Sequence, residues 1–195
     1  MKKTLIALGL ILTLPFIAAA VAPKEFKIEK SVTIDKPSSE VFAYVKMMQN
    51  NKNWQPWSKL DSNIKRELSG EDGLVGAILT WSGNPQVGAG EQEIKSISEG
   101  QRIEYELRFK EPMNTTNTSF ITTEAVNDYQ TVVTWNMEGR TDFPMNLISY
   151  LMHDKVAQDF TNGLKNLKEI LEKPSEAQAK VEAIEEPAKT EEQIN

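Results

Sequence analysis

The longest regular pattern in this chain is an apolar stripe near its carboxy-terminal end, and it limits the possible folds more than any other feature. From about Pro144 to Glu172, apolar side chains recur at helical steps of three and four residues. A helix of this length spans roughly 40 Å at 1.5 Å per residue. The pattern therefore predicts one long amphipathic helix, which needs an extended apolar surface to pack against. The stripe contains Ile148, Met152, Val156, Phe160, Leu164, Leu167 and Leu171.

The segments before this helix contain strands joined by short turns, and they predict such a surface. Residues 103–110 alternate apolar with charged side chains, as in a strand with one buried face and one face in water. Pro37 opens a short amphipathic helix after the first strand. Because no helix interrupts the later strands, the sheet is predicted to be an antiparallel meander. Further strands are predicted at Phe26–Ile34, Ile64–Leu68, Leu74–Trp81, Val87–Ile97, Thr115–Ala125 and Thr131–Gly139.

These elements predict a single α+β domain over residues 24–173, with a curved antiparallel sheet wrapped around the long carboxy-terminal helix. This arrangement is known as a helix grip. Residues 174–195 lack aromatic side chains and contain six glutamates against two lysines, so they are predicted to be an acidic disordered tail.

Residues 1–22 form a hydrophobic leader before the domain. Two lysines near its start precede an uncharged run over residues 4–22. Two interpretations stay open: the run has the length of a membrane anchor, roughly 17–25 apolar residues, while the small residues at 18–22 favour cleavage of a signal peptide. In either case the lysines should stay in the cytoplasm. The sequence thus predicts an extracytoplasmic domain, in the periplasm or cell envelope, with residues 4–22 as a candidate inner-membrane anchor.

Composition excludes several classes of function. The net charge is −6 and no basic block is present, which argues against nucleic acid as a partner. There is no cysteine and His153 is the only histidine, so no metal site and no cofactor are predicted. A Ser-His-Asp triad is not expected, because Asp154 directly follows His153 and points about 100° away from it on a helix.

Aromatic side chains gather on the inward faces of the predicted strands and on the segment Asn53–Ser58, where two tryptophans flank a proline. For Trp81 and Trp135 taken singly, core packing is the alternative. For the set, a cavity lining is predicted, because a small concave sheet that grips one helix rarely fills its interior. The candidate ligand contacts are Trp54, Trp57, Trp81, Glu91, Tyr105, Phe109, Trp135, Met152 and His153.

Two of these candidates are polar and could anchor a ligand. Glu91 is either solvated or turned inward by the preceding Gly88–Gly90 segment, where a raised pKa would let it protonate a ligand carbonyl. His153 lies either at the surface of the long helix or facing the cavity beside Met152. No catalytic residue is assigned.

Several segments between about Phe26 and Lys173 carry a resemblance to a known family. They are Phe26–Ile34, Lys36–Phe42, Asn53–Ser58, Gly73–Trp81, Gly88–Glu91, Asn117–Thr118, Val132–Trp135 and Asp159–Lys168. The chain resembles the START-like (SRPBCC) superfamily, which includes Bet v 1 and the polyketide cyclase/dehydrase-type proteins, and its leader is like that of bacterial members. The resemblance implies a helix-grip fold whose deep cavity receives lipids, sterols or polyketides, but it implies no reaction, since the family has no universal catalytic motif.

The sequence therefore predicts binding or transport of a hydrophobic small molecule, lipid or polyketide-like, in an internal cavity near a membrane. An alternative is a cyclase- or dehydrase-like enzyme that uses a cavity carboxylate; Glu91 or His153 deep in a pocket would favour it. A further alternative is a protein-interaction module with a filled core, resembling the Hsp90-activator branch, which a large exposed apolar patch would favour. Ligand identity and oligomeric state stay open.

Overall fold

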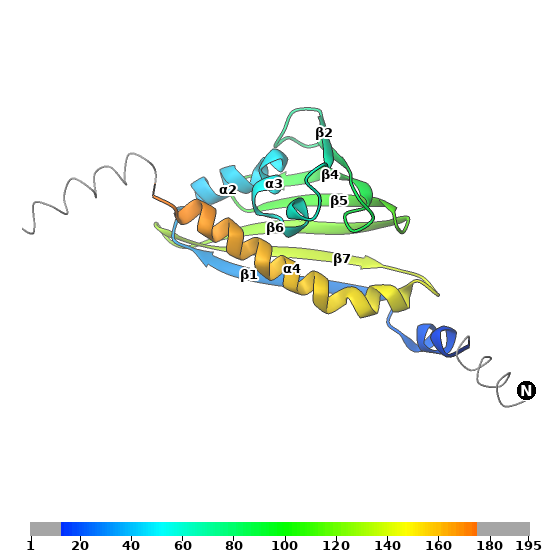
Figure 1. Cartoon of the computed structure of the whole chain (residues 1–195). Helices are drawn as coiled ribbons and strands as arrows, with labels where there is room; N and C mark the ends of the chain where they lie inside the picture. The colour runs from blue at the N-terminus through cyan, green and yellow to red at the C-terminus, as the bar shows by residue number, and fades with distance from the viewer. Residues whose placement is uncertain (1–12, 175–195) are drawn as a thin grey trace, which may run out of the picture.

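A seven-stranded antiparallel sheet curves around one long helix in the computed structural model, which describes residues 13–174 (Figure 1). The strands lie in the order β1-β7-β6-β5-β4-β3-β2. They are β1 (Glu25–Ile34), β2 (Lys65–Ser69), β3 (Ile78–Ser82), β4 (Ala89–Ser98), β5 (Arg102–Glu111), β6 (Thr115–Asn127) and β7 (Gln130–Arg140). The helices are α2 (Ser38–Lys46), α3 (Asn51–Trp54) and α4 (Asn146–Glu172), with short 3-10 turns η1 (Met48–Asn50) and η2 (Pro56–Lys59).

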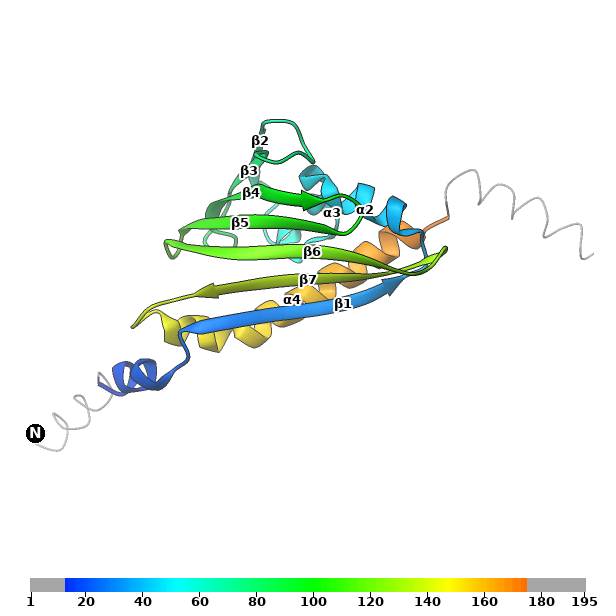
Figure 2. The ribbon, with the colours of Figure 1, turned by 180° about the vertical axis from the view of Figure 1, so that it is seen from behind.

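The strand order confirms the predicted meander. β2 to β7 each lie beside the next strand in the chain, and β1 returns to pair with β7, with Val32 opposite Val133. Seen from behind, the strands lie in front of α4, so the helix covers one face of the sheet (Figure 2). The predicted α+β helix-grip fold is thus confirmed.

The hydrophobic core lies between the concave face of the sheet and the helices. Val41 and Val45 of α2 are completely buried, as are Ile94 and Ile103 of the sheet. Phe160, Leu164 and Leu167 of α4 are at most 2% exposed and bring the carboxy-terminal half of the predicted apolar stripe into the same cluster, while Ile148 and Met152 at its start are 45% and 42% exposed. Burial of the carboxy-terminal half, rather than helical propensity alone, holds α4 in place.

A glycine lets α4 approach the sheet closely. A Cβ atom at Gly163 would lie 3.0 Å from the Trp135 ring and 3.2 Å from the Pro56 ring. Both distances are tighter than ordinary van der Waals contact, so a larger residue would push the helix away from the sheet. The middle of α4 is therefore positioned by Trp135 on β7 and by the segment that carries Trp54 and Trp57.

Two predicted strands begin later than the sequence pattern indicated. Leu74 and Val75 belong to a turn instead of β3, because Gly73 and Gly76 on either side adopt positive φ angles of 77° and 88°. β4 starts at Ala89, since Gly88 has a φ of 68° and its N–H donates to the Asn84 carbonyl in a turn. Positive φ angles are accessible to glycine and break the ladder, so apolar content alone overestimated both strands.

The last part of the leader is helical over residues 13–21 and contacts the start of α4. The Asn146 side-chain amide donates hydrogen bonds to the carbonyls of Ala19, at 2.7 Å, and Ala22, at 2.9 Å. The rings of Phe16 and Phe143 lie 6.2 Å apart between centroids. Within residues 13–174, no helix combines the length and apolar character needed to cross a bilayer. Residues 1–12 and most of the predicted tail lie outside the described part.

Candidate ligand-binding pocket

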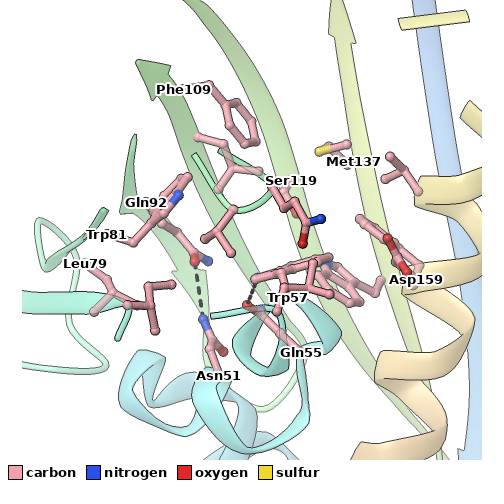
Figure 3. Close-up of a pocket in the computed structure, with 18 of the residues that line it drawn as sticks. Asn51, Gln55, Trp57, Leu79, Trp81, Gln92, Phe109, Ser119, Met137 and Asp159 are labelled. Atoms are coloured by element: carbon pink, nitrogen blue, oxygen red, sulfur yellow. Dashed lines mark hydrogen bonds between the residues drawn. The ribbon is translucent and has the colours of Figure 1, made fainter. Parts of the chain in front are cut away.

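A pocket of about 280 Å³ lies between the concave face of the sheet, the α3–η2 segment and the amino-terminal half of α4 (Figure 3). Most of its walls are apolar, and a few polar side chains point into it. The residues that line it are Asn51, Gln55, Trp57, Leu60, Ile64, Arg66, Leu79, Trp81, Gln86, Val87, Gln92, Leu107, Phe109, Ser119, Ile121, Trp135, Met137, Met152, Lys155, Val156, Asp159 and Phe160.

Two aromatic groups form much of the wall. In the first, Trp135 stacks on Phe160 with centroids 3.8 Å apart, and Trp57 packs against Trp135 at 5.4 Å. In the second, Trp81 meets Phe109 edge to face at 5.6 Å. Such tilted and edge contacts hold aromatic rings in place, so these walls are preformed surfaces for an apolar ligand.

The position of Trp81 depends on a glycine in the neighbouring strand. Gly90 lies opposite Trp81 across the β3–β4 ladder, at a register shift in the pairing of β4 with β5. A Cβ atom at Gly90 would lie 2.5 Å from the Trp81 ring, so that only glycine lets the ring rest on the strand. Gly90 thus allows the close approach of the Trp81 ring to the β4 backbone, and this approach shapes the pocket wall.

Amide side chains provide hydrogen-bonding groups inside the pocket. Asn51 of α3 donates to the side-chain oxygen of Gln92 at 3.3 Å, and Trp57 donates to that of Gln55 at 3.0 Å (Figure 3). The Asn51 side-chain oxygen is buried and has no hydrogen-bond partner among residues 13–174. A buried acceptor without a partner is costly, so the Asn51 amide is only partly satisfied where it borders the pocket.

Three charged side chains also reach the pocket. Lys155 and Asp159, one turn apart on α4, form an ion pair with a separation of 3.2 Å. The guanidinium of Arg66, on β2, donates to the hydroxyl of Ser58 at 2.8 Å. Desolvation by partial burial lowers the pKa of Arg66. Because the α4 pair is internally neutral, the pocket wall carries one net positive charge.

Five of the nine predicted contact residues line the pocket: Trp57, Trp81, Phe109, Trp135 and Met152. Trp54 and Tyr105 are instead buried in the core next to it, at 0% and 1% exposure. Burial, and then the charge of Asp72, raise the pKa of Tyr105 far above its usual range, so its phenol stays neutral. For these two residues, core packing is the role that the structure supports.

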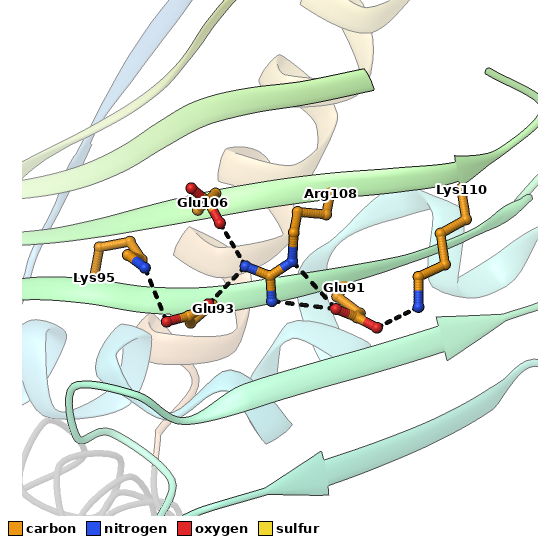
Figure 4. Close-up of polar contacts among 6 residues, drawn as sticks. All are labelled: Glu91, Glu93, Lys95, Glu106, Arg108 and Lys110. Carbon is orange, nitrogen blue, oxygen red and sulfur yellow. Dashed lines mark hydrogen bonds and ion pairs between the residues drawn. The ribbon is translucent and has the colours of Figure 1, made fainter. Parts of the chain in front are cut away.

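Glu91 lies on the opposite face of the sheet, in an ion-pair network with Arg108 and Lys110 (Figure 4). Alternation along β4 turns Gln92 toward the pocket, and therefore turns Glu91 and Glu93 away from it. Hydrogen bonds from Lys110 and then Arg108 lower the pKa of Glu91, which is the opposite of the raised pKa that acid catalysis would need. Of the two interpretations left open for Glu91, the structure therefore supports the solvated one, and Glu91 does not line the pocket.

His153 also lies outside the pocket. Its Nε2 atom is 3.4 Å from the Lys27 carbonyl of β1, and its Nδ1 atom is 3.1 Å from the carboxylate of Asp154. The side chain is 39% exposed. Of its two interpretations, the structure therefore supports the one at the surface of the long helix, and His153 does not line the pocket. Among residues 13–174, no group of three or more His, Cys, Asp or Glu side chains is placed to hold a metal ion.

Several residues of the pocket wall were not predicted from the sequence, among them Arg66, whose local pattern could have revealed it. Ile64, Arg66 and Leu68 alternate along their segment, so the arginine occupies the position of an inward residue between two apolar ones. That spacing was a usable signal. Gln92 gave a comparable signal, because it shares a face of β4 with Gly90 and Ile94 and alternates with charged neighbours, whereas Gln55 gave none, because it lies outside any strand.

Residues 25–172 match the model of the family described as "Polyketide cyclase / dehydrase and lipid transport". The chain therefore belongs to this family, a branch of the START-like superfamily, as the sequence resemblance implied. No curated protein matches the chain significantly.

Solved structures share the fold at low sequence identity. Truncated norcoclaurine synthase from Thalictrum flavum matches with a TM-score of 0.61 and 11% identity, over 80% of this chain and 98% of that one. A protein from Chromobacterium violaceum matches at 0.55 and 15%, over 75% and 97%. Aha1 from Colwellia psychrerythraea, solved as a dimer, matches at 0.53 and 16%, over 75% and 96%. These likenesses establish the Bet v 1-like fold and nothing about function.

Proposed function

We propose that this protein binds or carries a hydrophobic small molecule in the pocket between the sheet and α4. The observation that carries the proposal is the pocket itself, about 280 Å³ in volume, with the half-buried rings of Trp57, Trp81 and Phe109 on its wall. An apolar ligand that covers such rings removes their apolar surface from water, and this burial favours binding.

The size and polarity of the pocket support a small or single-chain ligand. Its volume lies just below the range of roughly 300–1,000 Å³ that is typical of small-molecule sites. A few amides, such as Gln55 and Gln92, could orient a ligand by hydrogen bonds while the aromatic walls supply most of the affinity. Membership in a family whose description includes lipid transport agrees with this class of ligand.

We further propose that the protein works outside the cytoplasm, close to a membrane. Support comes from the apolar leader and from an exposed apolar surface at the start of α4. Tyr150 and Leu151 are 58% and 68% exposed, and Met152, at 42%, belongs both to this surface and to the pocket wall. The leader residues Phe16 and Ile17, also largely exposed, lie nearby through the Phe16–Phe143 contact. An apolar surface of this kind beside the pocket suits uptake of a ligand from a bilayer.

The two alternative functions have weaker support. The enzyme hypothesis relied on Glu91 or His153 inside the cavity, and neither lines the pocket. The filled-core hypothesis conflicts with the presence of the pocket, although the exposed surface at Tyr150 and Leu151 is a feature that it would share. Ligand binding is therefore the hypothesis to test first.

Native mass spectrometry of the full chain, purified without detergent, tests the binding proposal. We expect a co-purifying small molecule, or uptake of an added fatty acid or aromatic polyketide. Leu107→Trp, which enlarges a wall residue, should abolish binding, while Val126→Trp, at a 58% exposed position away from the pocket wall, should not. A ligand-free protein that takes up none of the added compounds would contradict the proposal.

Protease treatment of intact spheroplasts tests the proposed location. If the domain lies outside the cytoplasmic membrane, added protease should digest it while a cytoplasmic marker protein survives. The intact mass of the protein recovered from the membrane and soluble fractions would show whether the leader is retained. Survival of the domain until the membrane is lysed would contradict an extracytoplasmic location.

A further inference from the structure

Arg66 is a charged residue in a mostly apolar wall. It lies on β2 directly opposite Trp81 of β3, so that its guanidinium and the tryptophan ring face the same pocket. The hydroxyl of Ser58, 2.8 Å from Nη2, orients the guanidinium from the η2 turn. One hydroxyl satisfies one of the five guanidinium N–H groups, so most of its donors are available to a ligand.

The four arginines of the chain differ in their partners. Arg102, Arg108 and Arg140 each form an ion pair with at least one carboxylate. Within the described part of the chain, Arg66 forms none, and burial lowers its pKa, whereas hydrogen bonds to Glu93 and Glu106 raise the pKa of Arg108. A partly buried guanidinium without a counter-ion is unfavourable, and an anion at this position would relieve that penalty.

The remaining charges of the pocket do not neutralise Arg66. Asp159, the carboxylate on the wall, is engaged by Lys155 on the same helix turn. The excess positive charge in the pocket contrasts with the net charge of −6 of the whole chain. The pocket is therefore a local exception to a charge distribution that otherwise repels anions.

We propose that the ligand is amphipathic and carries a single acidic headgroup, a carboxylate, which binds the guanidinium of Arg66 while its apolar part covers Trp81 and Phe109. Arginine suits this task because its planar fork matches a carboxylate with two parallel hydrogen bonds. The Ser58 hydroxyl holds the fork in the orientation in which the remaining N–H groups can reach the ligand. This inference rests on the proposed binding function and names the class of its ligand.

Tryptophan fluorescence of the full chain, titrated with probes of one chain length, tests the inference. The probes are dodecanoate, dodecyl phosphate, dodecanol and dodecyltrimethylammonium, each below its micelle-forming concentration. We expect dodecanoate to bind at least about tenfold more tightly than dodecanol, as a charge-assisted hydrogen bond predicts, and the cation to bind most weakly. Tighter binding of dodecyl phosphate than of dodecanoate would overturn the assignment of a carboxylate in favour of a phosphate headgroup.

Three substitutions locate the anion site. Arg66→Gln should remove the preference for dodecanoate over dodecanol, and a cooperative thermal unfolding transition of the variant shows that it is still folded. Arg66→Lys should keep part of the preference. Lys65→Gln, which removes an exposed charge from the adjacent position of the same strand, should change neither affinity.

The outcomes separate this inference from the binding proposal. If no probe binds the wild-type protein, the proposed function itself fails. If dodecanoate and dodecanol bind equally, or if Arg66→Gln keeps the preference, the pocket binds apolar ligands without an anion site and the inference fails alone. Loss of the preference in Lys155→Gln but not in Arg66→Gln would likewise overturn it, because the anion would then bind at α4.

Discussion

At the scale of single residues, the four tryptophans of this chain have two different roles, which burial separates. Trp54 is completely buried in the core, where its ring meets that of Trp135 edge to face at 4.7 Å; Trp135, at 5% exposure, belongs both to the core and to the pocket wall. Trp57 and Trp81 are only half-buried and present ring surface to the pocket. Large buried aromatic rings stabilise a core, whereas the half-buried rings keep surface available for a ligand.

Substitution of these tryptophans should therefore separate stability from binding. Trp54→Ala is expected to lower the free energy of unfolding by about 3–5 kcal/mol, as for other buried aromatic residues. Trp81→Ala should lower it by less, because part of its ring is already solvated, but it should weaken ligand binding. Chemical denaturation and fluorescence titration measure the two effects. Equal losses of stability in both variants would contradict this division of roles.

At the scale of elements, the β4–β5 hairpin presents two chemically different faces. Gln92, Leu107 and Phe109 line the pocket, while the alternate positions carry the ion-pair network centred on Arg108 (Figure 4). Hydrogen bonds from Arg108 and then Lys95 lower the pKa of Glu93, as those from Lys110 and Arg108 lower that of Glu91. The network therefore links two neighbouring strands through charge on the solvent side.

The pH dependence of stability should reveal this network. A carboxylate with a lowered folded-state pKa stabilises the protein above its ordinary pKa, about 4.3 for glutamate, and this contribution is lost as the pH falls through the lowered value. The Tm of the wild type should thus decrease when the pH is lowered below about 4. Arg108→Gln should lower the Tm at neutral pH, because Glu91, Glu93 and Glu106 would then repel one another without their shared cation. On acidification the Tm of this variant should decrease less than that of the wild type, because protonation removes the repulsion.

Arg140→Gln provides the control, because its ion pairs with Glu25 and Asp142 are more exposed. Exposed pairs contribute little, so this variant should keep the wild-type dependence of Tm on pH. The Tm of wild type and both variants is measured by thermal denaturation between about pH 3 and about pH 7. This range extends from about one unit below the ordinary glutamate pKa to about three units above it. Parallel curves for wild type and Arg108→Gln would show that the network does not stabilise the folded state.

At the scale of the whole molecule, the end of the leader helix is joined to the domain through Asn146. This residue is fully buried, and its amide donates to two carbonyls at the carboxy-terminal end of the helix over residues 13–21. Such carbonyls lack partners within their own helix. Asn146 therefore caps the end of the leader helix and is also the first residue of α4.

Asn146→Ala should release this contact. We expect backbone amides in residues 13–22 to exchange with solvent about tenfold faster or more, since two buried hydrogen bonds are lost, while amides of the sheet keep their protection. Asn162→Ala removes an amide from an exposed position of the same helix, where it pairs with Gln158, and should have no such effect. Unchanged exchange in residues 13–22 of Asn146→Ala would show that other contacts hold the leader.

Much of the fold could be predicted because it depends on local patterns. The stripe that became α4 and the alternation of residues 103–110 report which face of each element is buried. The errors in the fold came where glycines with positive φ, such as Gly76 and Gly88, delayed the start of strands that apolar content alone would have begun earlier. In the pocket, the aromatic candidates Trp57, Trp81 and Phe109 were found from their strand faces and from the tryptophan segment.

The fold class, the element order and the aromatic character of the interior could be predicted from the residues alone, because they follow from periodicity and composition. Which polar groups face the pocket depended on how the elements pack in three dimensions. This packing turned Glu91 outward and brought Arg66 inward, since a side chain's face depends on the register of its strand against its neighbours. Whether an aromatic ring fills the core, as Trp54 does, or leaves a pocket, as Trp81 does, depends on how elements distant in sequence pack together.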